Sequence, residues 1–243
     1  MKIFAQSDVG KARDMNQDCY SILDEQDFKL CLLADGMGGY KGGEIASKLA
    51  VNAAESYIKN NFMSIEKVTE QILKLISNAI EYANMIVYEK SKEDVELKDM
   101  GTTLDVCLIF NGKLYIGHVG DSRVYRIRKN IIRRITTDHS YVEKLVKEGT
   151  ITKDEAVNHP KKNMLTKALG CSSYVEPDLL YKVFQNGDVL LMCSDGLTNM
   201  VKEDEIYNII VNNKEDDVAK KLVKLANELG GYDNITSLVV KNI

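Results

Sequence analysis

The chain has 243 residues, of which 44% are hydrophobic and 28% charged, and its formal net charge is −4. The apolar content argues against a disordered chain, and the acidic balance argues against a general nucleic-acid binder, which normally carries a basic excess. No apolar run approaches the roughly 18 residues that a membrane span requires, and the N-terminus has no long apolar signal segment, so we expect a cytoplasmic protein that does not enter a membrane. No Gly/Ser-rich linker interrupts the chain, and we expect a single domain over residues 1–243.

The cysteines and histidines restrict the metals that the chain could bind. Five cysteines are an odd number without a Cys-x-x-Cys pair, which argues against a disulfide framework and against a cysteine-rich zinc site. Cys31, Cys107 and Cys193 lie inside apolar runs and are predicted to be small core residues in a reducing compartment. The chain has three histidines and no His-Glu-x-x-His motif, so any metal must be bound by carboxylates.

The first half of the chain predicts one strand followed by two helices. The strand is an apolar run at 30–34, which ends in Asp35-Gly36. The helix after the glycine cluster has apolar residues four apart on one face, namely Ile45, Leu49 and Ala53. The strongest helical pattern covers 65–83, where apolar residues repeat at spacings of three and four.

The second half predicts hairpins and two further helices. Each hairpin centres on a dipeptide suited to a tight turn, namely Asn111-Gly112, Lys129-Asn130 and Asn186-Gly187. Their expected strands are 104–110 with 114–119, 124–127 with 131–135, and a strand over 189–194 that follows the third turn. Helices near 203–211 and 216–229, the latter with Gly230 at its C-terminal end, precede a last strand at 235–240. Hairpins combined with two pairs of helices indicate two packed antiparallel sheets covered by helices.

Residues 138–178 differ from the strands around them. The segment is polar, with a short helical pattern at 142–146 and a capping-box pattern from Thr152 to Glu155, before Pro160. Long excursions of this kind are often functional lids, and we expect a flap at about 138–178.

Four aspartates recur at the ends of expected strands or beside glycines, namely Asp35, Asp121, Asp195 and Asp233. A single Asp-Gly pair is typical of an ordinary turn. Four such carboxylates converging without histidine or cysteine would form a hard oxygen site, which suits Mg²⁺ or Mn²⁺ and disfavours Zn²⁺ or copper.

Several phosphate chemistries are excluded by absent motifs. The glycine-rich segment 36–43 fits neither the P-loop nor the dinucleotide-binding pattern. No cysteine has an arginine six residues later, as a cysteine phosphatase loop would need, and no Asp-x-Asp pair exists for aspartyl-phosphate chemistry.

In order and spacing, the motifs resemble those of the metal-dependent protein phosphatase family, the protein phosphatase 2C type, in its bacterial serine/threonine branch. They run almost from end to end: Ser7-Asp-Val-Gly10, Arg13-Asp-Met-Asn-Gln-Asp18, Ala34-Asp-Gly-Met-Gly-Gly39, Met100-Gly-Thr-Thr103, Gly120-Asp-Ser-Arg123, Asp138-His-Ser140, Ser194-Asp-Gly196 and Asp233-Asn-Ile-Thr236. The resemblance implies an α+β fold, an αββα sandwich of two antiparallel sheets flanked by helices. It also implies two Mn²⁺ or Mg²⁺ ions at one edge between the sheets.

The resemblance implies a role for each matching residue. Asp35 would bridge both metals as a catalytic residue, the Gly36 carbonyl would bind one of them, and Asp195 and Asp233 would complete the first metal site. Asp18 would not bind a metal directly but would contact a metal-bound water.

Two further roles are implied, each with an alternative. Asp121, with Asp195, would hold a weaker third metal; the alternative is that Asp121 only stabilises its turn. Arg13 would bind the substrate phosphate as a catalytic residue, which its planar guanidinium suits; the alternative is an exposed arginine without a role.

Two positions depart from animal members of the family. Gln17 replaces a glutamate, so the second metal would depend more on water. Met37 replaces a histidine that would serve as general acid, and a thioether cannot donate a proton. The chain's own histidines have structural interpretations: His118 in the core or a buried network, His139 ordering the flap entrance, and His159 ending a short helix before Pro160.

The implied function is a phosphoserine/phosphothreonine protein phosphatase, a hydrolase in which metal-activated water attacks phosphorus in line without a covalent phosphoenzyme. The expected partners are phosphoserine and phosphothreonine proteins and a cognate serine/threonine kinase with its substrates, in cytoplasmic signalling. We expect a monomer that binds neither nucleic acid nor membrane.

Two alternative functions remain. A small-molecule phosphohydrolase on the same scaffold would prefer sugar phosphates or nucleotides to phosphopeptides. A catalytically inactive module that captures phosphoproteins would have lost a metal ligand, whereas Asp35, Asp195 and Asp233 are all present.

Overall fold

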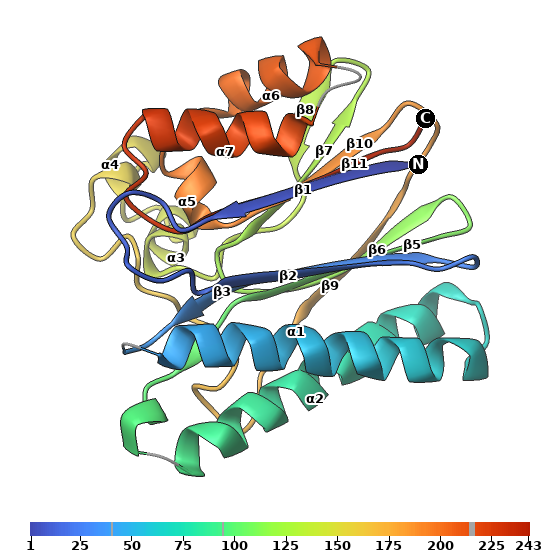
Figure 1. Cartoon of the computed structure of the whole chain (residues 1–243), viewed down its shortest axis with the longest axis horizontal. Coiled ribbons are helices and arrows are strands. Elements are labelled where there is room, and N and C mark those ends of the chain that lie inside the picture. The colour runs from blue at the N-terminus through green and yellow to red at the C-terminus, as the bar shows by residue number, and fades with distance from the viewer. Residues whose placement is uncertain (40, 94, 214–216) are drawn as a thin grey trace.

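The computed structural model describes residues 1–39, 41–93, 95–213 and 217–243. Its strands form two antiparallel sheets, which lie face to face (Figure 1). Sheet A has the strand order β1-β11-β10-β7-β8. Its strands are β1 (Lys2–Asp8), β7 (Arg123–Arg128), β8 (Ile131–Arg134), β10 (Val189–Cys193) and β11 (Ile235–Lys241).

Sheet B has the order β2-β3-β5-β6-β9, with the two-residue strand β4 paired to β3. Its strands are β2 (Asp18–Asp24), β3 (Lys29–Met37), β4 (Gly101–Thr102), β5 (Leu104–Phe110), β6 (Lys113–Val119) and β9 (Asp178–Val183).

Helices cover the outer face of each sheet (Figure 1). Sheet B is covered by α1 (Gly42–Asn61) and α2 (Thr69–Glu93), with short 3₁₀ turns at Phe62–Ser64 and Val95–Leu97. Sheet A is covered by α5 (Asp195–Thr198), α6 (Glu203–Asn212) and α7 (Val218–Glu228). The four layers form the αββα sandwich that the resemblance implies, and the predicted fold class is confirmed.

The inner faces of the two sheets enclose an apolar layer. It includes Cys31 and Leu33 from β3, Cys107 from β5, and Leu190 and Met192 from β10, all with no exposed surface. Cys31, Cys107 and Cys193 are buried and unpaired, as predicted for small core residues. This apolar layer holds the two sheets together and fixes where their ends meet.

Two of the three predicted hairpins are confirmed. Asn111 and Gly112 join β5 to β6 with φ of +47° and +70°, and Lys129 and Asn130 join β7 to β8 with φ of +48° and +61°. Two consecutive residues with positive φ are what a type I′ turn requires, and its twist matches that of the flanking strands.

The third predicted hairpin is wrong. Gly187 has a φ of +86°, but the strands on either side belong to different sheets, because β9 pairs with β6 in sheet B and β10 pairs with β7 and β11 in sheet A. Phe184 is buried between the sheets, and the Gly187 N–H donates to the Asn242 carbonyl instead of to a hairpin partner. A turn dipeptide predicts the backbone conformation of the turn itself, but it does not predict which strands pair with each other.

The strands β1 and β2 were not predicted, since the first expected strand was 30–34 within β3. Both are edge strands whose residues are mostly half-buried, so their apolar pattern is diluted.

The two helices on sheet B were predicted, with errors of detail. The buried face of α1 is one position later than predicted, namely Ala46, Ala50, Ala54 and Ile58, while Ile45, Leu49 and Ala53 pack at its side. The helix predicted over 65–83 begins four residues later and ends ten residues later, with its apolar stripe buried as expected.

The C-terminal elements agree with prediction to within one or two residues. Helices α6 and α7 occupy the ranges expected near 203–211 and 216–229, although Asp216 lies outside the described residues, and β11 matches the last strand.

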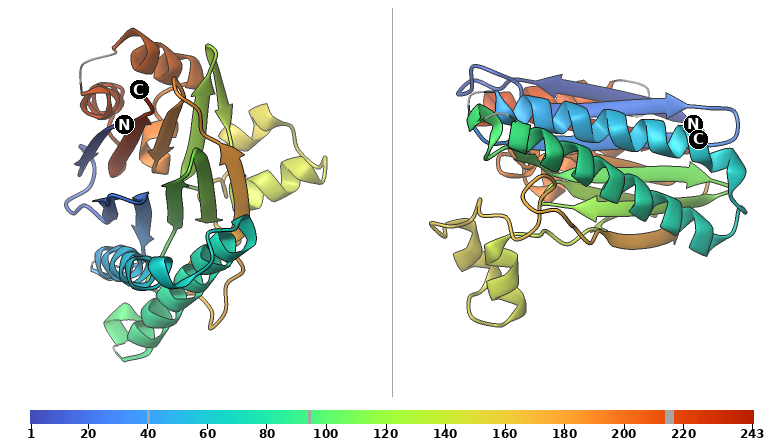
Figure 2. Two further views of the ribbon diagram at one scale, coloured as in Figure 1. Left: turned by 90° about the vertical axis from the view of Figure 1, so that its right-hand side faces the viewer. Right: turned by 90° about the horizontal axis from the view of Figure 1, so that it is seen from below.

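Residues 138–178 leave the sandwich before β9 and carry α3 (Tyr141–Lys147) and α4 (Lys153–Val157), which project to one side (Figure 2). The predicted capping box is present: the Glu155 N–H donates to Thr152 Oγ1, and Glu155 Oε2 accepts from the Thr152 N–H. None of the helices described here is both long and apolar enough to cross a membrane.

Candidate metal centre

The predicted aspartates lie on separate elements that begin or end at the same side of the sandwich (Figure 1). Asp35 lies near the end of β3, directly opposite Asp18 at the start of β2. Asp195 begins α5, Asp233 precedes β11, and Asp121 occupies the turn between β6 and β7. All four of the other carboxylates act electrostatically on Asp35, so the structure brings all five together.

Asp35 is the centre of this acidic cluster. Burial is the largest cause that raises its pKa well above the ordinary value, followed by the charge of Asp18 and then that of Asp195. Asp195 also has a raised pKa, through burial and then the charge of Asp233, and it shares a hydrogen bond with Asp35. Carboxyl groups in contact need a counter-charge, which either a shared proton or a cation supplies.

Asp18 lies beneath the cluster, and two hydroxyl groups hold it. Ser194 Oγ donates to Asp18 Oδ2 at 2.7 Å and Thr236 Oγ1 donates to the same oxygen at 2.6 Å. Asp18 Oδ1 is buried and has no hydrogen-bond partner. A buried carboxylate oxygen without a donor is costly, and a metal-bound water or a cation would satisfy it.

The backbone around Asp35 is fixed by the Met100–Thr103 motif. The Asp35 N–H donates to Thr103 Oγ1 at 2.8 Å, and the Asp35 carbonyl accepts from the Thr103 N–H at 2.9 Å and from Thr102 Oγ1 at 2.9 Å. The next residue must be glycine, because a Cβ on Gly36 would lie 2.1 Å from the Gly43 carbonyl oxygen. The end of β3 is therefore held rigidly where the aspartate must point.

Asn234 joins the N-terminal loop to the cluster. Its Nδ2 donates to the Val9 and Met15 carbonyls at 2.9 Å each, and its Oδ1 accepts from the Gln17 N–H at 2.8 Å. This one side chain thus sets the path of residues 9–17, which carry Arg13 and lead into Asp18.

Arg13 reaches the cluster from that loop. Its Nε lies 2.9 Å from Asp233 Oδ1, and its NH2 donates to Asp233 Oδ2 at 3.0 Å. These contacts with Asp233 raise the pKa of the guanidinium, and the charges of Asp195 and Asp35 raise it further. The arginine is half exposed, so its guanidinium lies between the solvent and the carboxylates.

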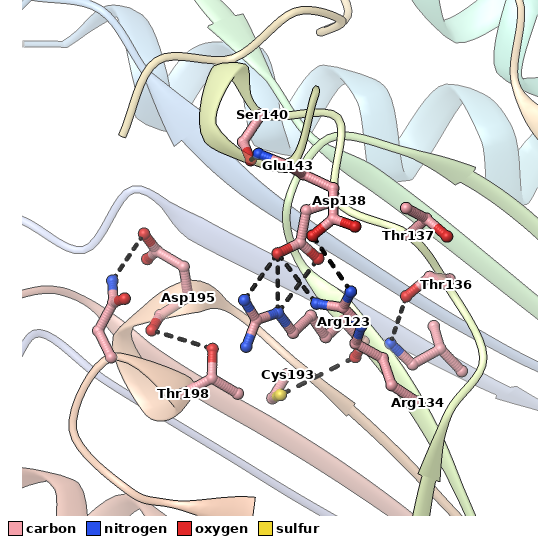
Figure 3. Close-up of polar contacts among 12 residues, drawn as sticks. Arg123, Arg134, Thr136, Thr137, Asp138, Ser140, Glu143, Cys193, Asp195 and Thr198 are labelled. Carbon is pink, nitrogen blue, oxygen red and sulfur yellow. Dashed lines mark hydrogen bonds and ion pairs between the residues drawn. The ribbon is translucent and has the colours of Figure 1, made fainter. Parts of the chain in front are cut away.

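Asp121 lies at the other side of the cluster. Burial, and then the charges of Asp195 and Asp138, raise its pKa to about 7. The neighbouring Arg123 is held by Asp138 through Nε and NH2, at 2.7 to 3.1 Å, and Arg134 also reaches Asp138 (Figure 3). Arg123 and Arg134 are therefore engaged by Asp138 at the base of the flap.

A cavity of about 550 Å³ adjoins the cluster between the flap helices and the start of α6. Its lining includes Asp121 and Asp195 from the cluster and flap side chains such as Glu143, Lys153 and Lys162. A bound molecule could therefore contact both the acidic cluster and the flap.

The donors present fit hard divalent cations. The cluster offers carboxylate oxygens and the Asp18 oxygen that lacks a donor, without histidine or thiolate, which is the ligand set of Mg²⁺ or Mn²⁺. As the side chains of the described residues lie, no three acidic, histidine or cysteine groups form a ready-made cage. In this arrangement Arg13 contacts Asp233, and Asp35 and Asn199 form hydrogen bonds with Asp195.

Several residues of the site had no predicted role. Ser194, Thr236 and Asn234 belong to motifs that were recognised, but only the folded chain shows that their side chains hold Asp18 and the N-terminal loop. The signal available in the sequence was their position next to Asp195 and Asp233.

The histidines behave as structural groups. His118 is buried, with Nδ1 2.6 Å from Asp105 Oδ1 and Nε2 3.0 Å from the Thr137 carbonyl. His139 lies at the start of the flap, as expected. Burial and then the charge of His118 lower its pKa to about 4.

Comparison with known proteins identifies the family. A family model described as Protein phosphatase 2C matches residues 10–233. The chain belongs to this family. The resemblance to this family that the sequence motifs indicated is confirmed. The predicted enzyme class, a hydrolase of the protein phosphatase type, is confirmed as well.

Relatives of this protein phosphatase 2C chain cover its full length. The serine/threonine phosphatase stp of Listeria monocytogenes is 37% identical over 237 residues, which span 97% of this chain and 93% of that protein. The structure of the S. agalactiae serine/threonine phosphatase has a TM-score of 0.89 at 36% identity and covers 99% of each chain. The catalytic domain of the serine threonine protein phosphatase PstP, solved with two manganese ions, has a TM-score of 0.84 at 33% identity and covers 98% of this chain and 96% of that one.

Proposed function

We propose that this protein is a metal-dependent phosphatase of phosphoserine and phosphothreonine residues in proteins. The observation that carries the proposal is the convergence of Asp35, Asp195 and Asp233 with Arg13 at one edge of the sandwich. The names of the full-length relatives support the substrate class. A module that only captures phosphoproteins would not need to keep this acidic cluster intact.

Asp35 is the residue that we assign as a ligand shared by two metals, with the Gly36 carbonyl beside it. Asp195 and Asp233 complete the first site, and Asp18 orients a water from behind. When bound, Mn²⁺ or Mg²⁺ would activate water as the nucleophile and neutralise phosphate charge. The rigid end of β3 and the hydroxyl groups on Asp18 hold these oxygens in place.

Arg13 is proposed to bind the phosphate oxygens of the substrate. Its guanidinium already lies at the edge of the cluster, 2.9 Å from Asp233. If a cation takes over the charge of Asp233, the Nε and NH2 groups of Arg13 that now contact Asp233 become free for a bidentate contact with phosphate. The arginine then positions phosphorus for direct attack by water, without a covalent phosphoenzyme.

Asp121, together with Asp195, is proposed to hold a weaker third metal. The two carboxylates interact through their charges, and both line the cavity beside the flap.

The setting of the enzyme is proposed by analogy with its relatives. We propose one catalytic domain over residues 1–243 with a flap at 138–178, acting as a monomer in the cytoplasm on kinase substrates and on a cognate serine/threonine kinase.

The deciding experiment is release of phosphate from a panel of phosphopeptides with Mn²⁺ and with EDTA. Sugar phosphates and nucleotides serve as competing substrate classes. We expect metal-dependent release from phosphoserine and phosphothreonine peptides and none in EDTA. Preferential hydrolysis of the small molecules, or equal rates in EDTA, would contradict the proposal.

A further inference from the structure

The turn that carries Asp121 is held from two sides: Thr103 Oγ1 lies 2.9 Å from Ser122 Oγ, and the root of the flap contacts the Gly120 backbone. Gly120 has a φ of +117°, and a Cβ there would lie 2.4 Å from Thr103 Cγ2, so the turn is tightly seated. Within the described residues, no other side chain donates a hydrogen bond to the Asp121 carboxylate. The direction of Asp121 therefore depends on the backbone at Gly120.

His139 contacts that backbone twice. The His139 N–H donates to the Gly120 carbonyl at 2.7 Å, and the Gly120 N–H donates to His139 Nδ1 at 3.1 Å. Because Nδ1 accepts a proton here, it is the unprotonated ring nitrogen, and the proton of the neutral ring is on Nε2. Nε2 lies 3.2 Å from Asp178 Oδ1 at the start of β9.

The ring itself cannot easily move. His139 is only 8% exposed, and its ring lies 4.8 Å, centroid to centroid, from the ring of His118. His118 is in turn fixed by Asp105 and by the Thr137 carbonyl. This support determines which way Nδ1 points.

His139 also lies where the flap leaves and returns. Its carbonyl accepts from the Thr166 N–H at 2.7 Å, and the Tyr141 N–H donates to the Met164 carbonyl at 2.7 Å. The residue that holds the Asp121 turn thus also ties the first residues of the flap to the segment at 164–166, which follows the flap helices.

We propose that His139 is a positioning residue for the third metal site: by holding Gly120 through Nδ1, it aims the Asp121 carboxylate at the site and fixes the flap root to it. The inference rests on the proposed role of Asp121 as a ligand of that metal. His139 does not contact substrate or metal, and it acts through the Gly120 N–H.

Two amide variants separate the two sides of the ring. In His139→Asn, Oδ1 takes about the position of Nδ1 and can still accept from the Gly120 N–H. In His139→Gln, the amide reaches about the position of Nε2 toward Asp178, and the acceptor for Gly120 is lost. His159→Gln makes the same change in the flap, away from Asp121, and serves as the control.

Two measurements read out the position of Asp121. Amide hydrogen exchange of Gly120, followed by NMR in EDTA, should be faster in His139→Gln and close to wild type in His139→Asn. In Mn²⁺ titrations of the intact chain, third-site affinity should fall about tenfold in His139→Gln, because a buried N–H is left without an acceptor. It should stay close to wild type in His139→Asn and in the control.

Asp121→Ala, measured in parallel, separates the inference from the function on which it rests. Equal effects of His139→Gln and His139→Asn, or unchanged Gly120 exchange in His139→Gln, would overturn the role of His139. If Asp121→Ala loses the third metal while His139→Gln keeps it at full affinity, only the inference about His139 is wrong. If Asp121→Ala binds the third metal like wild type, or wild type binds none, the proposed third site is wrong and the His139 role fails with it.

Discussion

Asp35, the proposed shared metal ligand, lies where the metal-free protein opposes a negative charge. Burial and four neighbouring carboxylates all oppose its charge. The structure keeps the residue there by fixing its backbone through Thr102 and Thr103. A carboxyl group whose pKa is raised by burial and by neighbouring carboxylates is a marker of a functional site.

Asp35→Asn tests that assignment. We expect phosphate release to fall by orders of magnitude, because the shared ligand is lost, while the fold persists and the EDTA-treated variant is no less stable than wild type. Asp27→Asn makes the same change in the exposed turn between β2 and β3 and should have no effect. Near-normal turnover of a folded, metal-loaded Asp35→Asn protein would show that Asp35 is not essential.

Arg13→Ala should raise KM for a phosphopeptide about tenfold or more, with a smaller fall in kcat, because a charge-assisted contact with phosphate is lost. Arg13→Lys should rescue only part of the loss, since an ammonium lacks the bidentate fork. Steady-state kinetics on one phosphopeptide measure both constants. Lys11→Ala, an exposed cation in the same loop, is the control, and equal kinetics for Arg13→Ala and Lys11→Ala would rule out the phosphate-binding role.

At the scale of elements, the packing of α2 on sheet B depends on a missing side chain. A Cβ on Gly117 in β6 would lie 2.4 Å from Ile76 Cγ2 and 2.6 Å from Ile80 Cδ1. The helix can therefore lie directly against the strand only where residue 117 is glycine.

Gly117→Ala should lower the free energy of unfolding by about 1–3 kcal/mol, the usual cost of overpacking a core. It should leave kcat/KM unchanged, because the added methyl points to the α2 side of sheet B, toward Ile76 and Ile80, whereas the neighbouring His118 points to the opposite face. Urea denaturation and phosphopeptide kinetics measure the two quantities. Lys74→Ala on the exposed face of α2 should change neither. Unaltered stability of Gly117→Ala would mean that the helix adjusts without strain.

The elements also show why some were predicted and others were not. The helix α2 and the hairpins at Asn111 and Lys129 are local structures, so their periodicity and turn residues suffice. The strands β1 and β2 lie at sheet edges, where half-buried residues carry little pattern. The partners of β9 and β10 depend on the other strands of two sheets, which no turn dipeptide encodes.

For the whole molecule, the acidic cluster makes stability depend on pH and metal together. In the metal-free protein, burial is the largest cause that raises the pKa of Asp18 and Asp121 to about 7, whereas in an unfolded chain aspartates titrate with a pKa of about 3.9. Between these values the folded state binds more protons, so its stability falls as the pH rises through this window. A cation that binds only the native cluster reverses the trend, because it prefers deprotonated ligands.

Thermal unfolding of wild type and Asp121→Asn in EDTA at pH 5 and pH 8 tests this expectation. His139 contributes the opposite trend, since its lowered pKa favours folding as the pH rises toward 6.5, but it is common to both proteins. We expect the Tm of Asp121→Asn, relative to that of wild type, to be higher at pH 8 than at pH 5. Excess Mn²⁺ should raise the wild-type Tm more at pH 8 than at pH 5. Parallel pH curves for the two proteins in EDTA would contradict the raised pKa of Asp121.

By itself, the sequence determined the local structures and the class of site: the strong helix, two hairpins, the capped flap helix, and aspartates at strand ends without histidine or cysteine. These follow from neighbours within a few positions, so periodicity, turn chemistry and residue type are enough. Only the tertiary structure decided which strands share a sheet, how Arg13 meets Asp233 across 220 positions and how Thr236 reaches Asp18 across 218. Such contacts form because the two apolar inner faces pack together and bring the strand ends to one edge, and no local pattern contains that information.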